Sequence, residues 1–134
     1  MYERRNAMEY RYHHFHLICS DLEDMERFFT GMLGAKLVER RKFGKADGAT
    51  LDLNGTRINL RVKREDENIT GDSSQPRYGY DHLGLDVEDV DAAYRELKEK
   101  GITFTVPPTD AVNGRMAFLK GPDGITIELF QTIR

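Results

Sequence analysis

Two histidines occupy equivalent positions in two similar stretches of this sequence. The segment 12–22, YHHFHLICSDL, aligns without a gap on the segment 80–90, YDHLGLDVEDV, at an offset of 68 residues. In this alignment His14 falls on His82. Similarity of a chain to itself at a fixed offset indicates a repeated structural unit. The two imidazoles are therefore expected at matching places in the two halves of the fold.

A second pair of matching positions combines an amide with a carboxylate. The tripeptide INL at 58–60 aligns on IEL at 127–129, at an offset of 69 residues, so Asn59 falls on Glu128. Imidazole and carboxylate groups are common ligands of zinc and of other divalent transition metals. If a twofold arrangement of the two halves brings these positions together, they form an open metal site. The predicted metal ligands are His14, His82 and Glu128.

Alternation along the predicted strands puts these residues on one face of a sheet. Successive side chains of a strand point to opposite faces, and the apolar residues of each predicted strand share a face, as Ile58, Leu60 and Val62 do. Helices are expected to cover that apolar face, so the other face carries an unusual number of polar side chains. They are His14, His16, Arg57, Asn59, Arg61, His82 and Glu128. If the sheet curls, they line a concave pocket.

Several residues of this polar face are candidates for catalysis or substrate binding. Glu128 and His16 are both candidate bases, and the sequence does not decide between them. Arg57 and Arg61 would bind a carboxylate or a phosphate if they line a concave site. Asn59 is a further candidate for contact with substrate.

The elements that must position these residues follow the same twofold pattern. Apolar residues recur at helical spacing after each repeat, and segments typical of strands follow each helix. The predicted strands are 36–41, 50–53 and 57–62 in the first half, and 102–106, 116–120 and 125–131 in the second. Each half therefore has the order βαβββ. The predicted fold class is α+β, with two βαβββ modules that form a curled mixed sheet around a metal cup.

The repeat also suggests how the chain is divided. Residues 12–134 are expected to form a single domain made of modules 12–62 and 80–131. The charged, turn-rich segment 63–79 joins the modules and could act as a lid, because loops of this length often have a function. Residues 1–11 are interpreted as an N-terminal extension.

Short-range signals mark where helices and hairpins begin and end. Ser20 followed by Glu23 has the spacing of a capping box, and Asp89 is a candidate N-cap. Gly34 and Gly101 lie where the two helices are expected to end. Hairpin turns are predicted at Asn54-Gly55 and Asp123-Gly124, and a loop at 107–114.

Composition excludes several classes of protein. The length of 134 residues fits one domain, and 39% hydrophobic residues are too many for a disordered chain. No apolar run is long enough to cross a membrane. With 20 Lys and Arg against 23 Asp and Glu, the net charge of −3 gives no basic excess for nucleic acid. The expected partner is a small molecule, and the single cysteine with no secretory signal predicts a cytoplasmic protein.

Taken together, these motifs resemble those of the glyoxalase superfamily, also called the vicinal oxygen chelate superfamily. The resemblance rests on the runs HFHLICSDL at 14–22, DHLGLDV at 81–87 and GPDGITIEL at 121–129, with Phe28-Phe29 and Leu33-Gly34. It implies paired βαβββ modules around a metal-binding cup. By position, His14, His82 and Glu128 match the metal ligands of the family.

One departure from the family pattern shapes the expected activity. Glyoxalase I has a second glutamate at the position of Asn59, whereas the epimerases of the family have a neutral amide there. The leading prediction is a metal-dependent lyase, isomerase or epimerase that abstracts a proton next to a carbonyl, similar to lactoylglutathione lyase or methylmalonyl-CoA epimerase. The runner-up is a non-haem Fe(II) extradiol-type dioxygenase, because two histidines and one carboxylate suffice for it.

Two further functions remain open at this point. One is a metal-free drug-binding module similar to bleomycin-resistance proteins. The other is a thiol transferase that acts on a phosphonate, which only Arg57 and Arg61 favour.

The resemblance also implies a cofactor and an assembly. The cofactor is a divalent metal ion, with Zn, Ni, Co, Mn and Fe as candidates. A homodimer is expected because the resemblance implies one and because two small modules leave sheet edges to cover. The sequence leaves open whether the site lies within one chain or between two. The substrate is a small molecule, anionic if the two arginines contact it.

Overall fold

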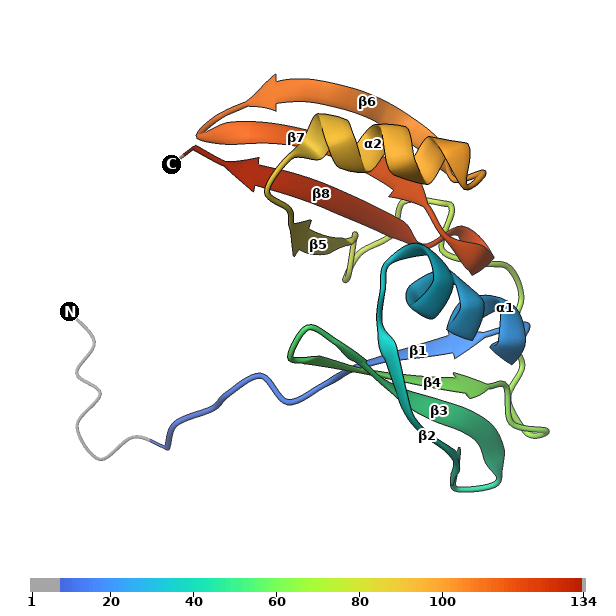
Figure 1. The fold of residues 1–134 in the computed structure, drawn as a ribbon. Helices are drawn as coiled ribbons and strands as arrows, with labels where there is room; N and C mark the ends of the chain where they lie inside the picture. The colour runs from blue at the N-terminus through green and yellow to red at the C-terminus, as the bar shows by residue number, and fades with distance from the viewer. Residues whose placement is uncertain (1–7, 134) are drawn as a thin grey trace.

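The computed structural model describes residues 8–133 and consists of two sheets, each with a helix packed against it (Figure 1). The first half of the chain forms β1 (Phe15–Cys19), α1 (Leu22–Arg27), the π-helical turn η1 (Phe28–Met32), β2 (Lys36–Phe43), β3 (Ala46–Leu53) and β4 (Thr56–Val62). The second half forms β5 (Leu83–Asp86), α2 (Val90–Glu99), β6 (Thr103–Ala111), β7 (Gly114–Lys120), the 3-10 turn η2 (Pro122–Gly124) and β8 (Thr126–Thr132). Part of the predicted N-terminal extension, residues 1–7, lies outside the described residues.

The two halves of the chain share one topology. The strand orders are β1-β4-β3-β2 and β5-β8-β7-β6. In each sheet the first strand runs parallel to the last, and the other pairs are antiparallel. A parallel pair needs a long crossover connection, which α1 or α2 provides. The predicted α+β fold with two βαβββ modules is confirmed.

The register of the strands repeats as well. In the first sheet Thr50 of β3 pairs with Asn59 of β4. In the second sheet Phe118 of β7 pairs with Glu128 of β8. The residues that the sequence repeat equates, Asn59 and Glu128, therefore occupy the same place in the two sheets.

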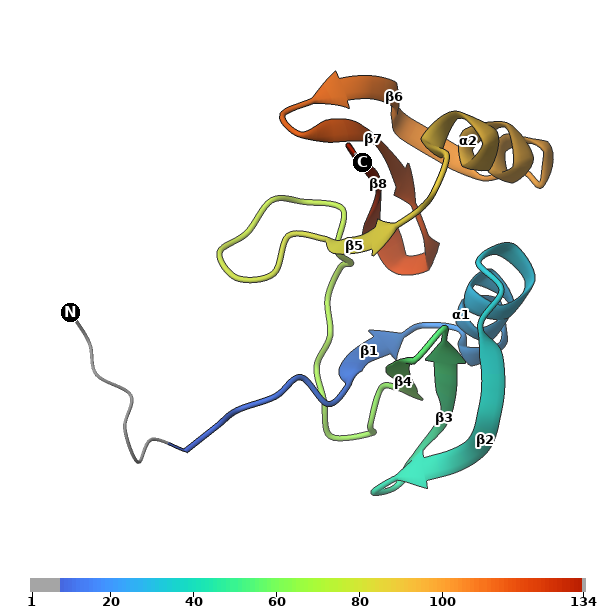
Figure 2. The same cartoon turned by 60° about the vertical axis from the view of Figure 1, so that its left-hand side comes forward.

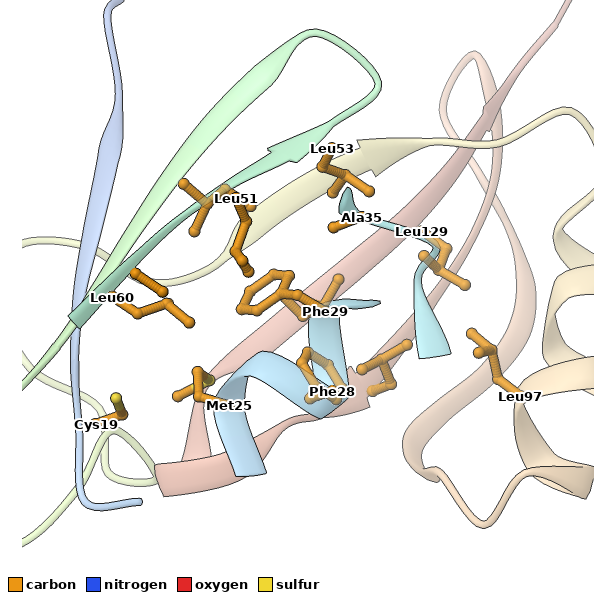
Figure 3. Close-up of a cluster of buried hydrophobic side chains, with 14 of the residues drawn as sticks. Cys19, Met25, Phe28, Phe29, Ala35, Leu51, Leu53, Leu60, Leu97 and Leu129 are labelled. Atoms are coloured by element: carbon orange, nitrogen blue, oxygen red, sulfur yellow. The ribbon is translucent and has the colours of Figure 1, made fainter. Parts of the chain in front are cut away.

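One apolar core joins both modules (Figure 3). Met25, Phe28 and Phe29 recur at the spacing of one helix face and are 0–5% exposed. They belong to the same buried cluster as Leu60 of the first sheet and Leu129 of the second. Because the apolar faces of both sheets pack on this core, each polar face lies on the outer side of its sheet.

Helix α1 lies between the two sheets in both views (Figures 1 and 2). A side chain at Gly121 would approach the ring of Phe28 to 3.0 Å, so the turn after β7 packs closely on this helix. The same turn holds the start of α1, because Asp123 accepts hydrogen bonds from the backbone N–H and the hydroxyl of Ser20 at 2.9 and 2.5 Å. These contacts tie the second module to the first.

The residue that caps the first helix differs from the predicted one. The N-cap is Asp21, whose carboxylate accepts a hydrogen bond from the backbone N–H of Asp24 at 3.1 Å. The capping box predicted at Ser20 and Glu23 does not form, because the Ser20 hydroxyl bonds to Asp123 instead. The prediction for the second helix is confirmed, since Asp89 caps α2 by accepting from the N–H of Ala92.

A predicted hairpin turn in the first module forms, whereas a predicted loop in the second module does not. Asn54 and Gly55 both have positive φ, at 50° and 96°, and connect β3 to β4 as predicted. The predicted loop at 107–114 is wrong, because β6 extends to Ala111. It passes through Pro107 and Pro108 with shifts in register. An edge strand tolerates proline in this way, because its outer side has no ladder hydrogen bonds to lose.

The segment between the modules has no helix or strand from residue 63 to residue 82. The backbone N–H of Ser73 donates to the carbonyl of Asp123 at 2.9 Å, which attaches this segment to the second module. No helix within residues 8–133 is long and apolar enough to cross a membrane.

Candidate functional site

The outer face of the second sheet brings together two of the three predicted metal ligands. His82 lies directly before β5, and Glu128 lies in the neighbouring strand β8. Nε2 of His82 is 3.1 Å from Oε1 of Glu128. Their side chains are 30% and 21% exposed, so both groups are partly shielded yet open to a ligand.

The residue before His82 holds its ring in place. Nδ1 of His82 donates a hydrogen bond to Oδ2 of Asp81 at 2.7 Å, which leaves Nε2 to face Glu128. Hydrogen bonding to Asp81, with a contribution from Glu128, raises the pKa of His82 although burial acts to lower it. A carboxylate on the second ring nitrogen is the usual partner of a histidine that binds a metal, because it fixes the tautomer and the ring orientation.

The third predicted ligand, His14, lies apart from this pair. It is exposed and precedes β1, and its Nδ1 is 2.8 Å from Nδ1 of its neighbour His13. Within residues 8–133, no group of three His, Cys, Asp or Glu side chains is placed to hold a metal ion. A single chain therefore presents His82 and Glu128 together and His14 separately.

His16, one of the two candidate bases, packs against an aromatic ring on the first sheet. Its ring centroid is 4.6 Å from that of Phe43 and 6.1 Å from that of His14. Partial burial lowers the pKa of His16, and the positive charge of Arg61 lowers it further. Both effects favour the neutral form of its imidazole.

Asn59 is buried on the same face of the first sheet. It is only 7% exposed, and its Oδ1 accepts a hydrogen bond from the hydroxyl of Thr50 at 2.8 Å. This is the place that Glu128 occupies in the second sheet. The first module therefore offers a neutral amide, already hydrogen-bonded, where the second module offers a carboxylate.

The two arginines predicted to bind substrate differ in their surroundings. Arg61 is 8% exposed, and its guanidinium donates to both carboxylate oxygens of Glu67 at 2.7 and 2.8 Å. The hydrogen bonds from Arg61 lower the pKa of Glu67 to about 2. Arg57 is exposed and has no hydrogen-bond or ion-pair partner within residues 8–133. Only Arg57 is thus immediately available to an anion.

Sequence reasoning missed three residues that shape this site. Asp81 and Glu67 hold His82 and Arg61, and Thr50 holds Asn59. Asp81 could have been found, because a carboxylate next to a candidate ligand histidine is a plausible orienting group. Thr50 and Glu67 gave no such signal, because their contacts depend on the pairing of β3 with β4 and on the path of the segment that follows.

Comparison with known proteins places this arrangement in a family. Residues 11–129 match the Glyoxalase/Bleomycin resistance protein/Dioxygenase superfamily, and the chain belongs to this superfamily. It is 30% identical to the uncharacterised protein YwkD of Bacillus subtilis (strain 168), over 89% of this chain and 94% of YwkD. It is 28% identical to a probable lactoylglutathione lyase of Synechocystis sp. (strain PCC 6803), over 84% of this chain and 88% of that protein.

A solved structure gives the same assignment. The glyoxylase/bleomycin resistance protein/dioxygenase domain from Frankia sp. EAN1pec superposes with a TM-score of 0.78 at 25% sequence identity. The superposition covers 94% of this chain and all of that one. The family resemblance found in the sequence motifs is therefore confirmed.

The donor groups of the second sheet fit a divalent metal ion, as the superfamily implies. An imidazole nitrogen and a carboxylate oxygen approach each other from neighbouring strands, and the imidazole is oriented by a second carboxylate. Nitrogen and oxygen donors of this kind suit zinc and the other first-row divalent ions. A third ligand is needed to complete the set, and His14 is the predicted one.

Proposed function

We propose that this protein is a divalent-metal-dependent enzyme that removes a proton from a carbon atom next to a carbonyl group. The class of reaction is that of a lyase, isomerase or epimerase. The observation that carries the proposal is the pair of His82 and Glu128, 3.1 Å apart, with Asp81 on the second nitrogen of the imidazole.

The ligand set would be His82 and Glu128 with His14. Because the two sheets share one core, their polar faces lie on the outer sides of the sheets, and His14 stands apart from the other two ligands. A second copy of the chain that places its first module against this second module would supply His14. The proposed active unit is therefore a homodimer with a site shared between chains. The outer strands β1 and β5 each leave one edge unpaired within residues 8–133, which a second copy could cover.

Glu128 is the proposed base. One of its oxygens faces His82, while the other makes no hydrogen bond within residues 8–133 and is open to a substrate proton. A carboxylate in this place takes the proton from the carbon and returns it to the same or a neighbouring carbon. Asn59 lacks this ability, because an amide cannot accept a proton at neutral pH, but it would donate a hydrogen bond to a substrate oxygen.

A divalent ion bound by these ligands would act as a Lewis acid that stabilises the negative charge developing on the carbonyl oxygen. The chain contributes the rest of the chemistry. Asp81 orients His82, and Glu128 holds and moves the proton. The proposed substrate is a small carbonyl compound, and Arg57 would bind an anionic group if the substrate carries one.

Exchange of the substrate proton with deuterium from solvent tests this function directly. The two substrates to test are the hemithioacetal of methylglyoxal with glutathione and methylmalonyl-CoA, each followed by NMR in D₂O. We expect metal-dependent exchange with at least one of them. The exchange should be lost in Glu128→Gln and retained in Glu65→Gln, a control on the exposed linker.

A dioxygenase is the second candidate, and one observation favours it. Asn59 is already occupied by Thr50, which leaves two histidines and one carboxylate as the ligand set. This set is the one that non-haem Fe(II) oxygenases use. Fe(II)-dependent oxygen uptake with a catechol, together with no proton exchange, would overturn the leading proposal in favour of this one.

A further inference from the structure

The outer face of the second sheet carries apolar side chains beside the candidate metal ligands. Along β7, Ala117 and Leu119 point into the core and are fully buried. Met116 and Phe118 alternate with them and lie on the outer face, as does Phe130 of β8. We call the outer-face residues Met116, Phe118 and Phe130 the aromatic surface. All three side chains are partly exposed.

Contacts within the sheet join this surface to the site. Phe118 is opposite Glu128 in the strand register, and its ring lies edge-on to that of His82 with 5.1 Å between the centroids. Met116 is opposite Phe130 in the same register. The Phe130 ring packs on the bare backbone of Gly114, where an added Cβ would come within 2.6 Å of it. The aromatic surface is therefore continuous with the pair of His82 and Glu128.

The matching positions of the first module have no large apolar side chain, although the ring of Phe43 packs on Gly48 and against His16. Thr50 stands opposite Asn59 where Phe118 stands opposite Glu128. Arg61 pairs with Gly48 where Phe130 pairs with Met116. Since one module folds with Thr50, Gly48 and Arg61 at these places, folding alone does not require Phe118, Met116 and Phe130 in the other. The partly exposed rings need another explanation, because exposed apolar patches beside a site usually bind something.

We propose that the aromatic surface binds the apolar group of the substrate, while the substrate's oxygen atoms are held at His82 and Glu128. The substrate class is then a small α-hydroxy or α-keto carbonyl compound with an aromatic or bulky apolar substituent. This inference rests on the proposed function, since it takes the same pair as the site of the carbonyl oxygens. The short distance from Phe118 to His82 sets the substituent directly beside the oxygen-bearing carbons.

The binding of matched ligands tests the proposal. Mandelate and lactate share the α-hydroxy acid group, but mandelate has a phenyl substituent where lactate has a methyl group. Hexahydromandelate is a third ligand, with a bulky apolar substituent that is not aromatic. Their dissociation constants are measured by calorimetry with full-length protein equilibrated with Zn²⁺, and again after chelation. From the apolar area of a phenyl ring, mandelate is expected to bind roughly tenfold more tightly than lactate.

Three variants locate the effect. In Phe118→Ala and Phe130→Ala, the ratio of the two dissociation constants should fall towards one, because mandelate loses more affinity than lactate. Tyr78→Ala, at a fully exposed aromatic residue outside the site, should leave the ratio unchanged.

Several results would overturn the proposal. They are equal binding of mandelate and lactate to the wild type, no measurable binding of mandelate, and an equal loss of both ligands in Phe118→Ala. Conversion of a dimer to a monomer by Phe118→Ala, seen by sedimentation, together with an unchanged ratio of the two dissociation constants, would assign the surface to contact with the second copy and not to the substrate. A preference for mandelate that survives chelation would contradict the proposed metal-dependent function but leave the aromatic surface as the binding site.

Discussion

At the scale of single residues, the proposed site depends on how one imidazole is held. His82 has a carboxylate at each nitrogen, Asp81 at 2.7 Å and Glu128 at 3.1 Å. The two contacts differ in kind, because Asp81 is its exposed neighbour in sequence while Glu128 comes from β8. We therefore assign orientation to Asp81 and ligation to Glu128.

Replacement of Asp81 by asparagine should weaken metal binding without unfolding the protein. An amide oxygen can still accept the hydrogen bond from Nδ1, but it no longer increases the basicity of the ring. Loss of such an orienting carboxylate typically costs about 10–100-fold in metal affinity. Competition with a chromogenic chelator measures this affinity.

The matched control is Asp66→Asn, which removes an equally exposed carboxylate from the linker. Its metal affinity should equal that of the wild type. If Asp81→Asn also matched the wild type, His82 would not be oriented through Nδ1 when it binds metal.

The sequence predicted the sheet positions of the candidate residues better than their contacts. The repeat correctly placed Asn59 and Glu128 at equivalent positions of two sheets, because period-two alternation fixes which face a strand residue occupies. It could not show that Arg61 is engaged by Glu67, because that contact depends on the path of a segment without helix or strand. His14 lies one residue before β1, where alternation no longer fixes its direction.

At the scale of elements, the segment after β4 is held to the first sheet by one buried ion pair. Arg61 of β4 donates to both oxygens of Glu67, and the backbone N–H of Arg64 donates to the same carboxylate at 2.8 Å. These three hydrogen bonds fold the start of the linker onto the end of the strand. A lid function for this segment would require them to break.

This ion pair should make stability depend on pH in the acid range. The pKa of Glu67 is lowered from 4.5 to about 2 in the folded protein, first by the hydrogen bonds from Arg61. A carboxyl group with a lowered folded-state pKa stabilises the fold at pH values above its unfolded pKa, and the contribution disappears as the pH falls towards the folded pKa. We therefore expect part of the wild-type stability to be lost between about pH 4.5 and pH 2 through this group.

Urea unfolding at pH 6, 4 and 3 checks the sign of this effect. Glu67→Gln should be less stable than the wild type at pH 6, and the difference should shrink at pH 3 because the variant has no such carboxyl group to protonate. Glu65→Gln, at an exposed position on the same segment, should follow the wild type at each pH. A difference between Glu67→Gln and the wild type that does not change with pH would contradict the assignment.

The ends of several strands differ from those that the sequence patterns predicted. The predicted strand 36–41 extends to Phe43 and the predicted strand 50–53 begins already at Ala46, because this hairpin continues to its turn at Gly44. In β6, the prolines that predicted a loop lie in an edge strand, which accommodates them. In both cases the pairing of neighbouring strands, rather than the preference of the local sequence for strand or turn, determined where the strand begins and ends.

At the scale of the whole molecule, two chains are proposed to share each site. Two inactive variants can test this together, because each is defective in a different module. His14→Ala removes a ligand from the first module, and Glu128→Ala removes one from the second. In a mixed dimer with shared sites, one site combines both defects and the other contains neither.

Mixing the two variants after unfolding and refolding should therefore restore metal binding and activity. With random pairing, half of the dimers are mixed and one of their two sites is intact, so recovery of about one quarter of the wild-type value is expected. Each variant refolded alone should stay inactive. If the mixture also stays inactive while sedimentation shows that mixed dimers have formed, the site lies within one chain.

The most direct test of the central claim is the metal content of the protein, measured by elemental analysis of wild-type protein purified without chelators. We expect close to one divalent ion per chain, lost in His14→Ala and in Glu128→Ala and retained in Glu65→Gln. Iron as the bound metal would favour the dioxygenase, whereas zinc, nickel, cobalt or manganese would favour the lyase or isomerase. Wild-type protein that holds no metal, even after each of these ions is added back, would contradict both enzymatic functions and leave a metal-free binding module.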